Sequence, residues 1–402
     1  MRPLRIAMLS IHSSPLGELG TSDTGGMSVY VRELCWELGR AGHTVDIYTC
    51  ADSRVPGSEM YLSDRVRLIH LRIGHGGHIA KGALFRHLPD VFRSIEAHMT
   101  DRQACYDLIH SHYWLSGWVG RYAQDSWFVP HVVMFHTTGM AKRIACGRER
   151  EPYLRMIAEK RLASASDRVL ATTEKERDLL MKYYGVPGEK IGVAPCGVNL
   201  ERFMPIARGM ARKELGLQNS RSVILYVGRF APVKGLERLI AAAAHLRHCR
   251  GLSLVIVGGD NRHAPAELIR LVKRSGVGDM IRFEGRVEHE VLPLYYNAAD
   301  VLVVPSYYES FGLAALESLA CGTPVVATPV GAMETLIRDG ESGLLVESPD
   351  PRSLAIAIEQ CLVTSSRGGM SRDEIRASVL RYGWSGIASA VVREYAAVLR
   401  SM

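Results

Sequence analysis

The 402-residue sequence has no long apolar run, no dense basic tract and no cysteine pair with the spacing of metal ligands or of a redox motif. No window approaches the ~18 unbroken apolar residues of a membrane-spanning helix, and the amino terminus lacks a signal-peptide pattern, so a cytoplasmic protein is expected. The eight scattered cysteines predict reduced thiols and no zinc. Because no basic run is interleaved with aromatic residues, nucleic acid is not expected as a partner.

The composition is that of a globular α/β protein. It is 47% hydrophobic and 23% charged, which together with the length predicts about two domains. The formal net charge of +7 fits a protein that handles phosphate-bearing small molecules, and it equally fits peripheral contact with an anionic membrane at its inner face. Membrane contact and a homodimer are left open.

Two series of short apolar runs alternate with helical stretches, which predicts two parallel sheets with crossover helices. Substrates bind beyond the carboxyl ends of such strands, so the active site is expected in a cleft between two Rossmann-like halves. A linker is expected at 203–209 and an amphipathic carboxy-terminal helix at 387–399. The first series comprises 5–10, 44–49, 66–71, 108–112, 131–136, 168–172 and 191–195, and the second comprises 223–228, 252–258, 281–284, 301–305, 325–327 and 344–347.

The segment 309–317 follows the apolar strand 301–306 and places two carboxylates around the start of a helix. Unpaired amides at a helix N-terminus attract anions, so Ser310, Phe311 and Gly312 are candidate main-chain donors to a diphosphate. Glu317, expected about two turns inside the helix, is a candidate acceptor for two ribose hydroxyls. From spacing alone, a solvated helix and loop explain the pattern equally well.

Three other features carry chemistry only in combination. The pair Gly25 and Gly26 allows a close approach of backbone to phosphate, although a plain turn is the commoner explanation. Arg229 and Lys234 follow the strand 223–228, where cations would stabilise a departing diphosphate, or would simply face solvent. His136 ends the strand 131–136 and is, from this evidence alone, more often structural than catalytic.

Together these motifs resemble the retaining nucleotide-sugar glycosyltransferases of family 4, which have the GT-B fold, over nearly the whole chain. The resemblance implies an acceptor-binding domain at 1–205, joined by the helix at 385–402, and a donor-binding domain at 206–384. The implied catalytic residues are His136, Arg229, Lys234 and Glu309. The implied donor-binding residues are Gly25, Gly26, Arg229, Lys234, Arg286, Glu309, Ser310, Phe311, Gly312 and Glu317.

A narrower similarity concerns the acceptor. Segments 109–117 and 23–30 resemble the inositol-phosphate N-acetylglucosaminyltransferases of mycothiol biosynthesis and, more distantly, the sucrose-phosphate synthases. The similarity implies an acceptor phosphate held by Lys81, Tyr113, Thr137 and Arg155. Ser28 stands where those enzymes have an asparagine that touches the inositol ring, so a phosphate is expected while inositol itself is put in question. Surface charge is the alternative for Lys81 and Arg155.

The sequence thus predicts a retaining enzyme that moves a hexose, glucose, N-acetylglucosamine or mannose, from a nucleotide diphosphate sugar to a hydroxyl acceptor. UDP is the expected nucleotide, a sugar or cyclitol phosphate the expected acceptor, and no cofactor or metal is required. The alternatives are a transferase acting on lipid-linked or free saccharides, and a GT-B sugar-nucleotide epimerase. A nicotinamide dehydrogenase is disfavoured because the first strand lacks the following Gly-x-Gly-x-x-Gly fingerprint. A non-catalytic binder would not need both Lys234 and Glu309.

Overall fold

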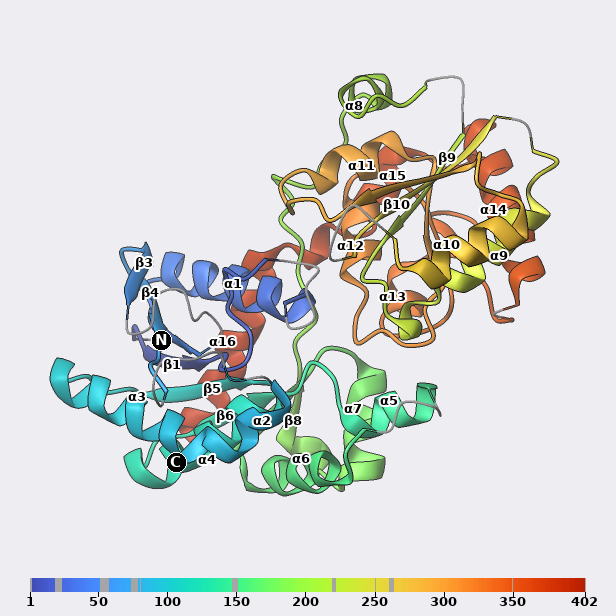
Figure 1. Ribbon diagram of the computed structural model, residues 1–402. Coiled ribbons are helices and arrows are strands. Elements are labelled where there is room, and N and C mark those ends of the chain that lie inside the picture. The colour runs from blue at the N-terminus through green and yellow to red at the C-terminus, as the bar shows by residue number, and fades with distance from the viewer. Residues whose placement is uncertain are drawn as a thin grey trace. The chain divides into compact units, whose positions relative to one another are not determined.

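The chain folds into two α/β units, each built on a mainly parallel sheet (Figure 1). The computed structural model describes residues 2–18, 24–50, 58–73, 79, 81–146, 151–218, 222–249, 251–259, 264–348 and 350–401. The amino-terminal unit takes the described residues up to 196 together with 384–401, and the carboxy-terminal unit takes 197–383. The prediction of two parallel-sheet α/β halves is confirmed.

The sheet of the amino-terminal unit has the order β3-β4-β2-β1-β5-β6-β7-β8. All neighbours are parallel except β3 and β4, and most strands are buried along their length, as in a sheet covered by helices on both faces. The order reverses between β1 and β5, so the connections that follow these two strands leave on opposite faces of the sheet and leave room for a ligand. The strands are β1 (Arg5–Leu9), β2 (Thr44–Thr49), β3 (Glu59–Ser63), β4 (Val66–His70), β5 (Leu108–His112), β6 (His131–Met134), β7 (Arg168–Ala171) and β8 (Ile191–Val193).

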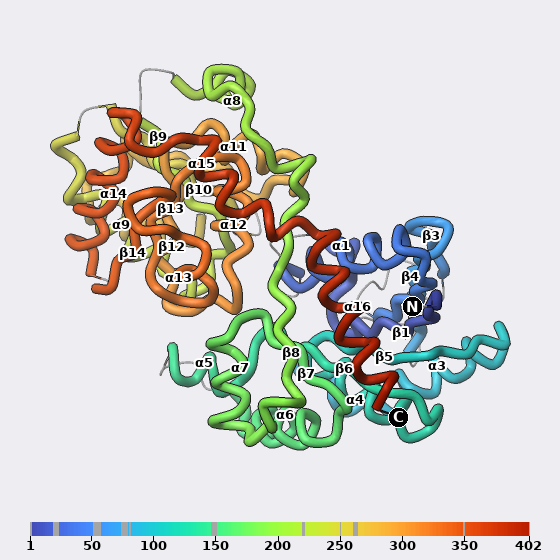
Figure 2. The backbone as a smooth tube through the Cα atoms, turned by 180° about the vertical axis from the view of Figure 1, so that it is seen from behind, coloured from blue at the N-terminus to red at the C-terminus, as the bar shows by residue number. Residues whose placement is uncertain are grey.

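Helix α16 returns from the end of the chain to the amino-terminal unit and packs against α1 (Figure 2). Its Tyr395 hydroxyl lies 2.7 Å from Nδ1 of His110, and Glu394 accepts a hydrogen bond from Arg168 at 2.7 Å. The helices of this unit are α1 (Gly26–Arg40), α2 (Lys81–Leu84), α3 (Leu88–Arg102), α4 (Tyr113–Trp127), α5 (Gly139–Cys146), α6 (Tyr153–Ala165), α7 (Glu174–Leu179) and α16 (Trp384–Arg400), with short turns η1 (Phe85–His87), η2 (Leu180–Tyr184) and η3 (Gly188–Lys190).

The carboxy-terminal unit has the strand order β11-β10-β9-β12-β13-β14, all parallel. This is the doubly wound order, whose reversal lies between β9 and β12. Its strands are β9 (Ser222–Val227), β10 (Leu252–Val257), β11 (Ile281–Gly285), β12 (Val301–Val304), β13 (Val325–Ala327) and β14 (Gly343–Leu345). Its helices are α8 (Arg208–Glu214), η4 (Pro232–Lys234), α9 (Leu236–His245), α10 (Ala266–Ser275), α11 (Leu292–Ala298), α12 (Leu313–Ala320), α13 (Met333–Leu336), α14 (Pro351–Ser366), α15 (Arg372–Ala377) and η5 (Leu380–Tyr382).

Three details differ from the sequence expectations. The antiparallel edge strand β3 was not predicted, because its residues are partly exposed and carry no apolar run. Glu317 is the fifth residue of α12, little more than one turn inside it. The units divide at 196/197 rather than within 203–209, because Arg376 donates hydrogen bonds to the carbonyls of Leu200 and Phe203 and so holds this segment on the carboxy-terminal unit.

Among the helices that the structure describes, none has both the length and the apolar character that crossing a membrane requires. Seven cysteines fall in the part of the chain whose side chains are described, and all seven are free thiols. The expectation of reduced cysteines therefore holds for these seven.

Four histidines on or beside β5 and β6 are buried in the core of the amino-terminal unit. Burial lowers the pKa of His110, His131 and His136 to about 3 and holds the pKa of His112 well below its ordinary value. Each imidazole is therefore neutral in the folded unit at neutral pH. The unfolded chain, by contrast, protonates them near pH 6.5.

This burial predicts acid sensitivity of the amino-terminal unit. Between pH 6.5 and about 3 the unfolded chain binds protons that the folded unit does not, so the free energy of unfolding must fall as the pH falls. We expect a loss of about 2 kcal/mol per buried histidine between pH 7 and pH 5. Burial raises the pKa of the Glu176 carboxyl, which opposes the trend, but this is one group against four.

The measurement is urea unfolding followed by tryptophan fluorescence at pH 7 and pH 5. All five tryptophans, at 36, 114, 118, 127 and 384, lie in the amino-terminal unit, so the signal reports that unit alone. Most carboxyl groups stay ionised in this pH window, which isolates the histidines. Equal urea midpoints at the two pH values would contradict the prediction.

Candidate functional site

The loop after β9 and the loop after β12 meet at the reversal of the carboxy-terminal sheet. The amide of Tyr307 donates a hydrogen bond to the carbonyl of Val233 at 2.8 Å, which joins the two loops. Gly235 adopts a positive φ of 65°, and a Cβ there would lie 2.1 Å from the carbonyl oxygen of Pro305. Only glycine permits this approach, so the turn that presents Lys234 is held directly against the end of β12.

Lys234 and Glu309 form an ion pair at this place. The Nζ atom of Lys234 lies 2.7 and 2.8 Å from the two carboxylate oxygens of Glu309, and the hydroxyl of Ser306 donates to the same carboxylate at 2.8 Å. Both side chains keep some exposure, 23% for Lys234 and 12% for Glu309. The pair is therefore ordered by its surroundings yet accessible to a ligand.

Helix α12 begins immediately after this pair. Gly312 has φ 113°, and a Cβ at that position would lie 2.2 Å from the terminal methyl of Met333, so its conformation and its packing both favour glycine. Gly312 offers no side chain to cap the helix, and the first turn of α12 carries no acidic residue. The amides of this turn are thus suited to an anion.

Glu317, in the second turn of α12, is buried and already engaged. Its two carboxylate oxygens lie 2.7 Å from Nε2 of His289 and 2.8 Å from the hydroxyl of Tyr296. Each oxygen has a second lone pair, so the carboxylate is oriented but not saturated. Burial, with the nearby Glu317 charge, holds the pKa of Tyr296 well above its usual value, so this hydroxyl stays a donor.

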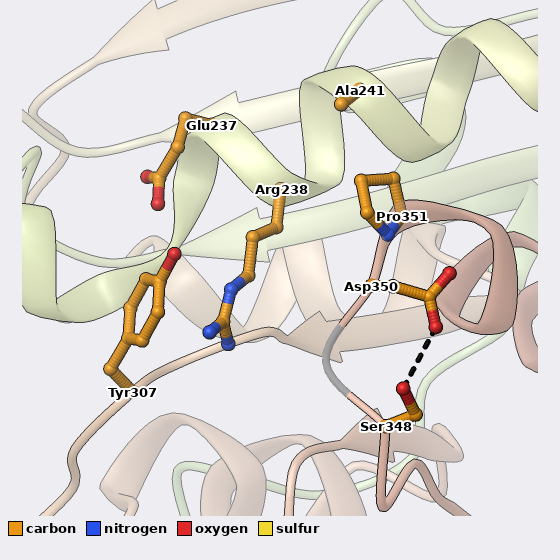
Figure 3. Close-up of a pocket in the computed structure, with 7 residues that line it drawn as sticks. All are labelled: Glu237, Arg238, Ala241, Tyr307, Ser348, Asp350 and Pro351. Carbon is orange, nitrogen blue, oxygen red and sulfur yellow. Dashed lines mark hydrogen bonds between the residues drawn. The ribbon is translucent and has the colours of Figure 1, made fainter. Parts of the chain in front are cut away.

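A separate pocket of about 500 Å³ lies among the first residues of α9, Tyr307 after β12 and the residues at the start of α14 (Figure 3). The guanidinium carbon of Arg238 lies 3.2 Å from the ring centroid of Tyr307, and Nη1 donates to the carbonyl of Pro305 at 3.4 Å. These contacts brace the loop that carries Glu309. The pocket is lined by Glu237, Arg238, Ala241, Tyr307, Ser348, Asp350 and Pro351.

In the amino-terminal unit, Tyr113 and His136 follow β5 and β6 with positive φ angles of 75° and 58°. Non-glycine residues rarely adopt this region, and such strain is commonest at functional sites. His112 Nε2 lies 2.9 Å from the thioether sulfur of Met8, which can only accept, so Nε2 carries the proton. His112 Nδ1 then accepts from Nε2 of His136 at 2.7 Å, which leaves Nδ1 of His136 as an acceptor.

Tyr113, Thr137 and Arg155 lie together beside this histidine. The guanidinium of Arg155 lies 4.9 Å from the ring centroid of Tyr113 and donates to the Thr137 carbonyl at 2.7 Å. It also donates to the carboxylates of Glu151 and Glu159 at 2.7 Å each. Surface charge is therefore not the explanation for Arg155, which is a buried and fully engaged cation.

Glu151 and Glu159 differ in how firmly they hold Arg155. Glu159 accepts further hydrogen bonds from the Gly139 amide and the Tyr184 hydroxyl, so it is fixed in the core. Glu151 is less buried and is shared by Arg155 and Lys142, whose Nζ lies 2.9 Å from it. These cations hold the pKa of Glu151 below its usual value despite its partial burial, so it is ionised.

The structure also places the remaining predicted residues. Gly25 precedes α1, where a Cβ would meet no atom within 4 Å, and Gly26 begins the helix. Ser28 is fully buried, and its hydroxyl lies 2.7 Å from the hydroxyl of Ser13. Lys81 begins α2, but its side chain lies outside the described residues. Arg229 and Arg286 are exposed at the ends of β9 and β11, while Ser310 and Phe311 precede α12.

Several supporting residues were not identified from the sequence. They are His112, Lys142, Glu151, Glu159, His289 and Tyr296. His112 sits within a recognised segment, and its position at the end of a strand could have marked it. The others depend on contacts between separate elements, and no local pattern signals them.

Comparison with known proteins agrees with this geometry. Residues 24–202 match the model of Glycosyltransferase Family 4, and residues 208–373 match that of Glycosyl transferases group 1. A D-inositol 3-phosphate glycosyltransferase 2 from Catenulispora acidiphila is 38% identical, covering 98% of this chain and 95% of the relative. A D-inositol 3-phosphate glycosyltransferase from Streptomyces bingchenggensis is 39% identical, covering 99% and 90%.

Solved structures give the same result. A sucrose-phosphate synthase from Thermosynechococcus elongatus superposes with a TM-score of 0.90 at 34% identity, covering 99% of this chain and all of that one. Anabaena HepE, solved in complex with UDP and glucose, has a TM-score of 0.76 at 19% identity over 98% of this chain and all of its own, and it supports the fold alone. The chain therefore belongs to the family 4 glycosyltransferases and is a glycosyltransferase of the GT-B fold.

Proposed function

We propose that this glycosyltransferase moves a hexose from a nucleotide diphosphate sugar, UDP-linked in the first instance, to a hydroxyl of a ring that bears a phosphate monoester, with retention of anomeric configuration. The observation that carries the donor half is the Lys234–Glu309 pair beside the uncapped start of α12. The observation that carries the acceptor half is the buried Arg155 with its exchangeable partner Glu151.

The proposed binding of the nucleotide-sugar donor rests on the charges of the side chains around the diphosphate. A departing diphosphate gains negative charge at the bond that breaks, and a lysine with helix-terminal amides stabilises that charge best when they are fixed beforehand. Glu309 holds Lys234 in place before the donor arrives, and then offers its carboxylate to hydroxyls of the transferred sugar. Glu317, oriented by His289 and Tyr296, receives the ribose, and Arg229 adds a second cation at the end of β9.

The proposed binding of the acceptor rests on the replacement of one anion, the Glu151 carboxylate, by another, the acceptor phosphate. Arg155, Lys142, Glu151 and Glu159 sum to no net charge. A phosphate monoester cannot add to this neutral set without strong repulsion from the carboxylates, but it can replace Glu151. Arginine then binds the phosphate with two parallel hydrogen bonds and lysine contributes a point charge.

The relatives favour inositol phosphate as the acceptor, because the two nearly full-length curated relatives described above are named D-inositol 3-phosphate glycosyltransferases. A sugar phosphate is the second candidate, since the sucrose-phosphate synthase is similar along the whole chain. Ser28 keeps inositol itself in question, because a serine whose buried hydroxyl lies 2.7 Å from that of Ser13 does not reproduce the asparagine contact that the resemblance implies. A panel of inositol 3-phosphate, hexose phosphates and their dephosphorylated forms, scored by nucleotide release and product mass, tests both.

A cytoplasmic location, peripheral membrane contact and a homodimer stay predictions.

Lys234→Ala and Arg229→Ala should each slow transfer about a hundredfold, the scale of losing one charge-stabilising donor. The measurement is kcat by nucleotide release at saturating donor. Lys273→Ala, an exposed lysine on α10 of the same unit, is the matched control and should leave kcat unchanged. Near-normal turnover in both variants would remove the diphosphate role from these cations.

Phosphorylated acceptors should exceed their dephosphorylated forms by at least about a hundredfold in kcat/KM, because a neutral ligand cannot replace Glu151 with another anion and so gains no charge-assisted hydrogen bond from Arg155. Arg155→Lys should shrink that ratio by raising the acceptor KM, since lysine cannot form the paired hydrogen bonds, while the donor KM barely moves. Arg161→Lys, exposed on the same helix α6, is the control. An unchanged ratio in Arg155→Lys would argue against the phosphate site.

Glu151→Gln should lower the acceptor KM about fivefold, the scale of one partly buried ion pair that no longer competes. The lower KM should appear only with phosphorylated acceptors. This restriction distinguishes displacement of Glu151 by the acceptor phosphate from a general change in the shape of the site. Glu174→Gln, an exposed carboxylate elsewhere in the unit, serves as control. A higher KM in Glu151→Gln would mean that Glu151 assists the acceptor instead of competing with it.

A further inference from the structure

Three side chains that can bind a metal converge on the carboxy-terminal unit, away from the residues assigned above. His248 and Cys249 lie in the turn that follows α9, and Glu359 lies in the middle of α14, which packs against α9. The three ligand atoms, Nε2, Sγ and Oε1, all lie within 4.8 Å of one another. His248 and Glu359 are exposed and Cys249 is partly exposed, so an ion from solution can reach them.

The separations fit one face of a tetrahedron. Nε2 of His248 lies 3.4 Å from Sγ of Cys249 and 3.4 Å from Oε1 of Glu359, and Sγ lies 3.9 Å from Oε1. Zinc bonds of about 2.0–2.3 Å at tetrahedral angles place such atoms roughly 3.3–3.6 Å apart. The three atoms therefore need to move only a few tenths of an ångström to share one ion, with water as fourth ligand.

The orientation of His248 is the second, independent observation. Its Nδ1 lies 2.9 Å from the backbone carbonyl of His245, which can only accept, so Nδ1 carries the proton and Nε2 presents its lone pair to Cys249 and Glu359. Histidines that bind metals are typically held in this way, with the other ring nitrogen donating to a carbonyl or a carboxylate. The ring is thus already in the tautomer and direction that a metal requires.

We propose that His248, Cys249 and Glu359 form a binding site for a zinc-like divalent cation that joins the end of α9 to α14. Thiolate, imidazole and carboxylate in tetrahedral array suit Zn²⁺ better than Mg²⁺ or Ca²⁺, which prefer oxygen ligands in larger numbers. The site departs from the expectation of no zinc because Glu359 is 110 residues from Cys249, so no spacing motif exists. It does not depend on the proposed substrates.

The site joins the two helices that also border the pocket beside the Glu309 loop (Figure 3). α9 starts directly after Lys234 and Gly235, and residues just before and at the start of α14 line the same pocket. A cation at the far end of α9 therefore stabilises the helix pair that supports the donor loop. The consequence is a stabilisation of the carboxy-terminal unit that rises with metal concentration.

The test uses Co²⁺ as a spectroscopic substitute for Zn²⁺ on the metal-free full chain. Binding should give one equivalent, with the absorption of tetrahedral Co²⁺ and a thiolate charge-transfer band, and Zn²⁺ should displace it. Cys249→Ser should abolish the thiolate band, while Cys105→Ser, which removes an exposed thiol of the other unit, should keep it. Retention of the band in Cys249→Ser, or no thiolate band in the parent protein, would overturn the proposal.

Two further variants test the other ligands. His248→Gln and Glu359→Gln should each weaken binding by at least about tenfold, because even partners outside the ligand set cost 10–100-fold when removed. In calorimetric unfolding, Zn²⁺ at a hundredfold excess over its Kd should raise the Tm of the carboxy-terminal unit by about 5–10 °C, and this shift should vanish in Cys249→Ser. All three side chains face solvent at least in part, so these variants are expected to fold. Unchanged affinity in both glutamine variants would exclude the site.

Discussion

The reversal of strand order in each parallel sheet is the constraint on which the site residues depend. At β1 and β5 in one unit, and at β9 and β12 in the other, the connections that follow the two strands leave on opposite faces of the sheet, which leaves room beyond the carboxyl ends. Tyr113 follows β5, Lys234 follows β9 and Glu309 follows β12. The chemistry can vary in these loops while the buried strands determine the fold.

Close contacts between backbone segments fix the positions of the loops at the reversal of the carboxy-terminal sheet. A Cβ at Gly258 would lie 1.9 Å from the carbonyl oxygen of Gly228, and one at Gly235 would lie 2.1 Å from that of Pro305. These close contacts restrict the conformation of the loop after β9. The position of Lys234 in that loop is therefore fixed relative to β12. An ordered cation stabilises developing charge without reorganisation, which is the main way such a site lowers a barrier.

The sequence was most informative where local pattern and burial coincide. The strands 44–49, 108–112 and 325–327 were predicted at their observed ends, and each is buried along almost its whole length. β3 was missed because an edge strand needs no continuous apolar run. The linker was placed too late because Arg376, some 170 residues downstream, holds the segment at Leu200 and Phe203, and no local signal records a contact of that range.

The candidate site shows the same limit. Lys234 lies in one short motif and Glu309 with Gly312 in another, 75 residues further on, and the structure brings the two motifs together. The residues that orient Glu317 could not be found from the sequence. His289 and Tyr296 contact Glu317 from 28 and 21 residues away in the chain, and they belong to other elements. Ser28 is buried with its hydroxyl 2.7 Å from that of Ser13, and its contact with the acceptor stays a prediction.

Two of the proposed ligand-binding cations are held by carboxylates in the free protein, Lys234 by Glu309 and Arg155 by Glu151 and Glu159. Such pairing lowers affinity for every ligand, because an incoming anion must first displace or share a partner. It lowers affinity most for neutral ligands, which gain nothing that offsets the broken ion pair. A diphosphate or a phosphate monoester carries more charge than the carboxylate it displaces and can make the exchange favourable. Discrimination between phosphorylated and unphosphorylated substrates thus arises from the carboxylates as much as from the cations, as expected where specificity is a difference between two affinities.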